Sequence, residues 1–117
     1  METNRIDDIG AAVAALSALA QPHRLAVFRE LVKAGENGLA AGEIARRLEL
    51  PASSLSFHLS NLKQAALLQE ERRGRTIIYR VDFATMRGVI AFLLESCCAE
   101  EGVQMAGIDE LIRGEPS

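Results

Sequence analysis

One stretch of the chain carries the clearest structural signal: GEIARRLELPASSLSFHLSNLKQAALL, residues 42–68. Its first part has apolar residues at helical spacing: Ile44, Ala45 and Leu48. This spacing predicts a short helix over residues 41–48. Pro51 is a typical start signal, and we expect a second helix over residues 53–66. Two helices separated by so few residues are typical of a helix-turn-helix, which here covers about residues 41–66.

A β-hairpin is predicted directly after this pair of helices. Residues 69–73 and 76–81 flank Gly74–Arg75, a two-residue turn with glycine first, which favours a hairpin. In a winged helix-turn-helix such a hairpin forms the wing, and here the wing covers about residues 68–81. The sequence therefore predicts a mainly α-helical fold with a small β-hairpin, a winged helix-turn-helix.

Helices are also predicted on the N-terminal side of this unit. Apolar residues recur at spacings of three and four over residues 4–20: Ile6, Ile9, Val13, Leu16 and Ala20. Pro22 suits the first turn of the next helix, and Gly35 suits its end. We expect the buried face of that helix to carry four apolar side chains: Leu25, Phe28, Leu31 and Val32. Residues 36–39 are predicted to form a loop.

A long helix is predicted after the wing, over about residues 82–101. Asp82 can cap its start, and Gly102 can end it. Its apolar positions alternate between spacings of three and four, as in a helix–helix seam: Phe83, Met86, Ile90, Leu93 and Cys97. Three more residues widen this stripe: Val89, Leu94 and Cys98. A last amphipathic piece follows, with Met105, Ile108, Leu111 and Ile112 as its apolar positions.

The length of 117 residues fits one domain, residues 1–117. Apolar residues make up 49% of the chain, which is more than a small monomer needs to bury and favours an oligomer. No apolar run reaches the ~18 residues of a membrane span. Residues 1–9 lack the basic and apolar segments of a secretion signal, so we expect a cytoplasmic protein with no membrane partner.

Charge is unevenly distributed along the chain, although the net charge is only −3. Residues 42–81 hold seven basic and four acidic side chains, net +3. Residues 1–41 hold four basic and five acidic ones, net −1, and residues 82–117 hold two and seven, net −5. Because the local field of a patch attracts phosphate whatever the total charge, we expect the middle of the chain to contact nucleic acid.

The predicted helix over residues 53–66 has two distinct faces. Its apolar stripe should face the core: Leu55, Leu59, Leu62 and Ala66. The opposite face holds small hydrogen-bonding side chains around one phenylalanine: Ser53, Ser54, Ser56, Phe57, Ser60, Asn61 and Gln64. Such a face lets a helix enter the major groove and read base edges, and an apolar ring can contact a thymine methyl. The alternative is a solvated face with one exposed phenylalanine.

Three arginines cluster near the predicted turn of the hairpin: Arg72, Arg73 and Arg75. An isolated cluster of this kind is more often solvated surface, but beside a helix-turn-helix it favours contact with DNA phosphates or the minor groove. His58 lies at the edge of the apolar stripe. We assign it a structural role and include it among the DNA-binding candidates for a phosphate contact.

Three stretches together resemble the ArsR/SmtB family of metal- and metalloid-responsive repressors. They are LSALAQPHRLAVFREL (16–31), the helix-turn-helix stretch quoted above (42–68) and ERRGRTIIYRVD (71–82). The resemblance covers about residues 5–101. It implies a homodimeric winged-helix repressor that dimerises through its first and last long helices and binds a twofold operator in double-stranded DNA. It also implies that an effector releases the protein from DNA.

The sensing sites of this family lie in different helices. One arsenite-sensing type has a Cys-Val-Cys pattern in the first helix of the helix-turn-helix, but residues 42–45 read GEIA. The zinc type has Asp and His ligands along the last long helix, but residues 82–101 contain Asp82 and no histidine. A third type has a vicinal cysteine pair near the end of that helix, and ESCC (95–98) resembles it. The third cysteine that often follows is absent from residues 99–117.

The adjacent thiols of Cys97 and Cys98 suit a trivalent arsenical. Thiolate is a soft ligand, and trivalent arsenic or antimony binds two or three sulfurs. A frayed helix end lets neighbouring sulfurs reach one centre, and two thiolates fit a singly methylated arsenical as well as arsenite. Two alternatives remain open, since the cysteines can pack as small apolar residues in the dimer seam or act as a redox or persulfide switch.

The sequence predicts a regulator and not an enzyme. It contains no Cys-x-x-Cys motif, no phosphate-binding glycine loop and no βαβ pattern, which disfavours a small thiol enzyme. We expect a repressor that requires no cofactor and has trivalent arsenic or antimony as its effector. Arsenite, antimonite or methylarsenite would bind Cys97 and Cys98 and release the operator. The alternative function is a redox- or persulfide-responsive regulator that uses the same pair.

Overall fold

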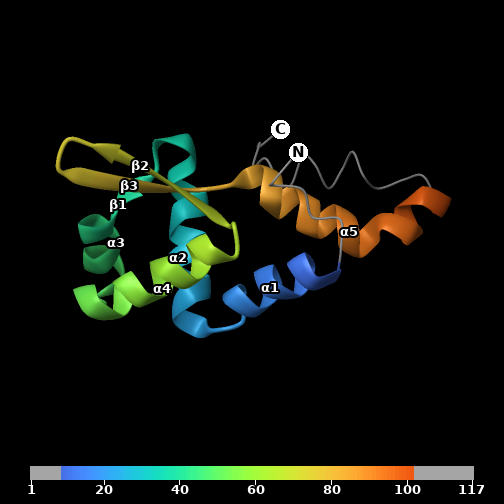
Figure 1. Ribbon diagram of the computed structural model, residues 1–117, viewed down its shortest axis with the longest axis horizontal. Coiled ribbons are helices and arrows are strands. Elements are labelled where there is room, and N and C mark those ends of the chain that lie inside the picture. The colour runs from blue at the N-terminus through green and yellow to red at the C-terminus, as the bar shows by residue number, and fades with distance from the viewer. Residues whose placement is uncertain (1–8, 102–117) are drawn as a thin grey trace.

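The computed structural model describes the backbone of residues 9–101 and the side chains of residues 9–95. In chain order, its elements are α1 (Ile9–Leu19), α2 (Pro22–Ala34), the 3₁₀ turn η1 (Gly35–Asn37), β1 (Leu39–Ala40), α3 (Ala41–Leu48), α4 (Ala52–Gln64), β2 (Leu68–Arg73), β3 (Thr76–Val81) and α5 (Phe83–Glu101). Figure 1 shows the β2–β3 hairpin projecting at one end of the molecule and α5 extending to the other. Helices with one small antiparallel sheet confirm the predicted fold class.

Both ends of α2 and the start of α5 follow from local capping chemistry. The side chain of Gln21 accepts the backbone N–H of Arg24 at 2.8 Å, Pro22 opens α2, and Gly35 ends it with a φ of 67°. Asp82 accepts the backbone N–H of Thr85 at 3.1 Å, which confirms its predicted role at the start of α5. The range of α3 agrees with the prediction, and α4 begins and ends one to two residues earlier than expected.

The sheet has one strand that the sequence did not reveal. Residues 36–39 were expected to form a loop, but Leu39 belongs to β1 and pairs with Tyr79 of the antiparallel neighbour β3. Gly38 permits this approach, because a Cβ at its φ of 66° would lie 2.4 Å from the carbonyl oxygen of Tyr79. The strand order is β1-β3-β2. In the hairpin, Arg73 pairs with Thr76, which confirms the two-residue turn.

The core lies where α2, α3 and α4 meet the sheet. Its fully buried side chains include Val27, Leu31, Ile44, Leu55 and Leu62 of the three helices and Leu67, the residue before β2. The prediction for α2 was partly wrong, because Leu25 and Val32 are 44% and 41% exposed. The core side of α2 is instead centred on Val27 and Leu31. Leu25 and Val32 lie on a flank of the helix that faces away from the core.

The helix α1 turns its bulky side chains away from the core. Its buried residues are small: Ala12, Ala15 and Ala18. Its larger aliphatic residues are Ile9, Val13 and Leu16, which are 71%, 54% and 41% exposed. On α5, Val89 is buried and Leu93 is 56% exposed. The chain therefore presents apolar side chains on the outside of two helices that contact each other.

Three predictions about the chain ends lie outside the described residues. They are the start of the first helix at residue 4 with Ile6, the helix stop at Gly102 and the amphipathic piece over residues 105–112. Within the described range, no single helix has the length and apolar character to cross a membrane. The helix α1 meets those criteria only together with residues 22–37, and that pair is bent by 97°.

Candidate nucleic-acid interface

The helix α4 is held by its apolar side and leaves a polar face free. Leu55, Leu59 and Leu62 are buried against α2, α3 and the sheet. Among the predicted contact residues, five are exposed: Ser53, Ser56, Phe57, Ser60 and Gln64. Ser54 and Asn61 are half-buried at the edges of this face. The structure therefore brings seven of the eight predicted α4 residues to one side of the helix.

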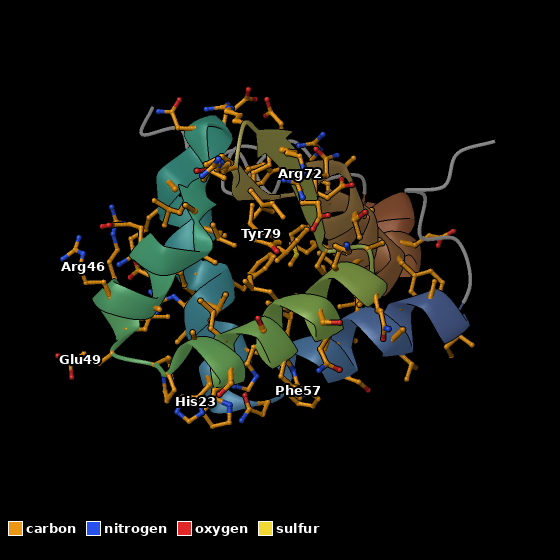
Figure 2. All side chains as sticks on the ribbon, turned by 60° about the vertical axis from the view of Figure 1, so that its left-hand side comes forward. His23, Arg46, Glu49, Phe57, Arg72 and Tyr79 are labelled. Carbon is orange, nitrogen blue, oxygen red and sulfur yellow. The ribbon has the colours of Figure 1, made fainter. Side chains whose placement is uncertain are left out.

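Phe57 is the most prominent apolar group on this face. Its side chain is 63% exposed, although a phenylalanine in a protein of this size usually contributes to the core. The side-chain amide of Asn61 donates to the carbonyl oxygen of Phe57 at 2.9 Å, which fixes the orientation of that amide. Figure 2 shows Phe57 along the same edge of the molecule as His23. An ordered amide beside an exposed ring is a surface suited to base edges.

His58 belongs to the core side and not to the exposed face. It is 8% exposed, and its ring stacks on that of His23 with centroids 5.7 Å apart and an interplanar angle of 21°. Burial lowers the pKa of His58, with further lowering by Arg24 and His23, so the ring is neutral at neutral pH. This burial fits the structural role assigned to His58, and its phosphate contact stays a prediction, although a buried neutral ring presents no charge to phosphate.

The wing carries exposed arginines with different partners. Arg73 donates to Glu71 at 3.1 Å, and Arg80 contacts the same carboxylate at 2.6 Å. The hydrogen bonds from Arg73 and Arg80 lower the pKa of Glu71 to about 2. Arg72 donates to the carbonyl oxygen of Gly74 at 3.4 Å. The side chain of Arg75, in the turn, is exposed and forms no hydrogen bond or ion pair with the described part of the chain.

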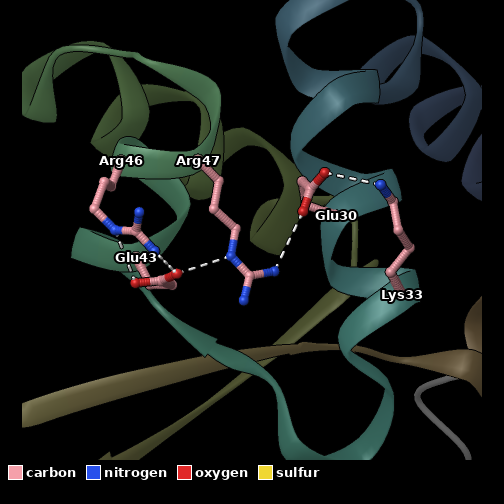
Figure 3. A network of polar contacts seen from close by, with 5 residues as sticks. All are labelled: Glu30, Lys33, Glu43, Arg46 and Arg47. Carbon is pink, nitrogen blue, oxygen red and sulfur yellow. Dashed lines mark hydrogen bonds and ion pairs between the residues drawn. The ribbon is translucent and has the colours of Figure 1, made fainter.

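A polar network on α2 and α3 was not predicted from the sequence. Glu43 accepts hydrogen bonds from both Arg46 and Arg47, and Arg47 also reaches Glu30 at 3.4 Å (Figure 3). Lys33 contacts Glu30 at 3.1 Å. The i,i+4 spacing of Glu43 and Arg47 in the sequence is typical of an ion pair within a helix. The ion pair of Arg47 with Glu30 of α2 could not be predicted from spacing. The network fixes α3, which in turn packs against α4.

The predicted sensing residues lie at the far end of α5. The helix continues through Glu101, so Cys97 and Cys98 are within its last two turns. Their side chains lie outside the described part of the structure. Among the residues that are described, no group of three or more His, Cys, Asp or Glu side chains is placed to hold a metal ion. The assignment of the pair to a metalloid stays a prediction.

A helix-turn-helix with a polar outer face and a cationic β-hairpin beside it defines a winged helix-turn-helix DNA-binding protein. The helix-turn-helix domain family HTH_20 matches residues 19–71. The HTH-type transcriptional regulator YgaV of Escherichia coli is 32% identical over 74% of this chain and 86% of its own. The transcriptional activator HlyU of Vibrio cholerae is 32% identical over 74% of this chain and 78% of its own.

Solved structures lead to the same family. An ArsR-like transcriptional regulator from Rhodococcus sp. RHA1 is 26% identical over 87% of this chain and 92% of its own, with a TM-score of 0.66. The homodimeric winged helix-turn-helix domain of Mb0332 from Mycobacterium bovis is 25% identical over 81% of this chain and 83% of its own (TM-score 0.60). The chain belongs to the ArsR family of DNA-binding transcriptional regulators, a family of regulators and not of enzymes.

Two further structures have names that describe a ligand specificity or a redox state. The antimony-specific transcriptional repressor AntR is 25% identical over 87% of this chain and 88% of its own, with a TM-score of 0.60. The reduced form of HlyU from Vibrio cholerae is 30% identical over 73% of this chain and 88% of its own, with a TM-score of 0.58. Relatives of similar distance thus include an activator, a metalloid-specific repressor and a protein described in a defined redox state.

Proposed function

We propose that this chain is a homodimeric transcriptional repressor that binds a twofold operator and is released when a trivalent arsenical or antimonial binds Cys97 and Cys98. The observation that carries the DNA-binding half is the exposed face of α4 around Phe57, together with the exposed guanidinium of Arg75 in the turn of the hairpin. The helix would read base edges in the major groove, and the wing would contact phosphates or the minor groove.

Dimerisation is supported by the apolar surface of α1 and α5. Ile9, Val13 and Leu16 recur on one face of α1 and are all exposed, and Leu93 is exposed on α5. Covering these side chains with a second copy would remove apolar area from water, which stabilises association. The homodimeric state of the Mb0332 domain is consistent with this arrangement. A dimer sets the distance between two recognition helices, which must match half-sites about one DNA turn apart.

The effector assignment rests on the chemistry of two neighbouring thiols. Thiolates are the softest protein ligands, and trivalent arsenic and antimony prefer them. The pair lies near the end of α5, the helix that we assign to the dimer interface. Binding there would alter the interface and thereby the spacing of the two α4 helices. The antimony specificity of AntR, a relative of the same fold, supports this class of effector.

The test is operator binding measured by fluorescence anisotropy, with an operator selected from random duplexes. Arsenite, antimonite or methylarsenite should weaken binding ~5- to 150-fold, the usual range of allosteric coupling. Cys97→Ser and Cys98→Ser should keep the DNA affinity and lose the response, whereas the neighbouring Ser96→Ala should keep both. Release that persists in both cysteine variants refutes the sensing site, and a monomer that ignores duplex DNA refutes the whole proposal.

A second candidate is a redox- or persulfide-responsive regulator that uses the same cysteines. It is favoured by the similarity to HlyU, which has a structure described as reduced. Peroxide or polysulfide would then release the operator, and arsenite would not. Mass spectrometry of the treated protein separates the two functions, because oxidation leaves a disulfide or persulfide mass at Cys97 and Cys98 and metalloid binding leaves an arsenic or antimony adduct.

A further inference from the structure

An apolar groove opens on the side of the molecule away from the core face of α2. It has a volume of about 300 Å³ and lies between the end of α1, the outer flank of α2 and the start of α5. Its walls are formed by Leu19, Leu25, Phe28, Val32 and Met86. Leu25 and Val32 are more than 40% exposed although they are large aliphatic residues. Such a surface gains free energy when an apolar segment covers it.

The rim of the groove is cationic. Arg29 and Lys33 both line it. Lys33 is paired with Glu30 at 3.1 Å, but the side chain of Arg29 forms no hydrogen bond or ion pair with the described residues. An occupant that complements this groove therefore has apolar side chains for its walls and a carboxylate for Arg29.

We propose that the C-terminal segment over residues 108–112 of the same chain docks in this groove. The segment has the required chemistry, with the apolar residues Ile108, Leu111 and Ile112 and the adjacent carboxylates Asp109 and Glu110. Its own net charge of −2 complements a cationic rim. The proposal is independent of the function assigned to Cys97 and Cys98.

The segment is long enough to reach the groove in its own subunit. Met86 lies 15 residues before the end of α5 at Glu101, which is about 22 Å along a helix. Seven residues of extended chain, 102–108, span about 23 Å. Ile108 and the residues after it can therefore lie beside Leu25 and Val32 once the chain reverses its direction at the end of α5.

Tryptic cleavage after Arg113 reports whether the segment is docked, because cleavage follows the population of the free segment. In the full-length protein, Arg29→Glu should speed the loss of the last four residues on the order of fivefold. Arg75→Glu, a matched change of another free arginine on the wing, should leave the rate unchanged. Arg29→Lys, which keeps the positive charge at the rim, should retain protection. Equal cleavage rates in the wild type and in Arg29→Glu overturn the proposal.

A spin label identifies the docked segment directly. In a Cys97→Ser, Cys98→Ser, Ser117→Cys background, a nitroxide at position 117 should broaden the amide signals of Arg29 and Val32 and spare those of the wing. Mixed dimers of labelled and ¹⁵N-enriched chains test which subunit provides the segment. Broadening only in mixed dimers, or in neither sample, contradicts docking within one chain. Neither tryptic cleavage nor line broadening depends on DNA binding. A negative result for docking is therefore distinguishable from a negative result for the proposed repressor function.

Discussion

The ring of His23, at the start of α2, stacks on the buried ring of His58 in α4, with centroids 5.7 Å apart. Arg24 holds a fixed position beside them, because its Nε donates to the carbonyl oxygen of Ala18 at 2.7 Å. Two imidazoles and a guanidinium thus face each other where α4 meets α2. Burial is the first cause that lowers the pKa of His58, and the neighbouring Arg24 and His23 act in the same direction.

This contact predicts a loss of stability in mild acid. The pKa of His58 in the folded protein is below the unfolded value of 6.5, so the unfolded chain takes up the proton first as the pH falls. The free energy of unfolding should therefore decrease below about pH 6.5. Urea titrations at pH 7.5 and pH 5 should show a larger decrease for the wild type than for His58→Gln. His23→Gln should retain most of the decrease, since burial persists. Equal decreases in the wild type and in His58→Gln contradict the prediction.

Phe57 should matter for DNA and hardly at all for folding. Because its ring is 63% exposed, Phe57→Ala should change the free energy of unfolding by no more than about 0.5 kcal/mol. Operator affinity should fall by about 1 kcal/mol or more, roughly fivefold, because the contact with the base edge is lost. Leu55→Ala, on the buried side of the same helix, should instead cost ~2–5 kcal/mol of stability. Anisotropy and thermal unfolding of both variants provide the test, and an unchanged affinity for Phe57→Ala removes this ring from the interface.

Local sequence signals were sufficient for the elements that depend on neighbouring residues. Pro22, Gly35, Asp82 and the Gly74–Arg75 turn act within a few positions, and the structure confirms each of them. The polar face of α4 was also predictable, because the spacing of its leucines fixes which side of the helix is buried.

Features that depend on distant partners could not be predicted in this way. The strand β1 exists only because Leu39 meets Tyr79, and two residues carry no periodicity. The sequence shows a stripe of bulky apolar residues on α1. It does not show that the alanines of this helix face the core and the bulky residues face outward. The environment of His58 includes the ring of His23 from another helix, which no local pattern shows. In each case the environment of the residue depends on a neighbour that is distant in the sequence.

Gly38 provides a test of that dependence on tertiary structure. A Cβ at this position would lie 2.4 Å from the carbonyl oxygen of Tyr79 and 2.8 Å from Cγ2 of Ile78, at a φ of 66°. Gly38→Ala should therefore lower the free energy of unfolding by roughly 2 kcal/mol or more, through backbone strain and overpacking. Gly42→Ala is the matched control, because its Cβ meets no atom within 4 Å and the position is helical. It should change stability little or raise it by up to ~1 kcal/mol. Equal effects of the two substitutions would show that the β1–β3 contact is not tight.

The arginines of the wing should differ in their contribution to DNA affinity because their ion pairs differ. Arg75 has no partner within the described chain, whereas Arg73 shares the carboxylate of Glu71 with Arg80. With its pKa lowered to about 2 by Arg73 and Arg80, Glu71 stays ionised at every pH used for DNA binding. The carboxylate therefore opposes phosphate contact by the guanidinium of Arg73.

Arg75→Ala should accordingly reduce the slope of log K against log salt by about 1, measured between roughly 50 and 200 mM salt. Arg73→Ala should reduce it by less, because that charge is partly compensated already. Glu71→Gln should tighten binding and steepen the slope, since it releases Arg73 toward phosphate, and Arg73→Ala should cancel most of that gain when the two are combined. If Arg73→Ala and Arg75→Ala reduce the slope equally and Glu71→Gln has no effect, the ion pair on the wing does not control its contact with DNA.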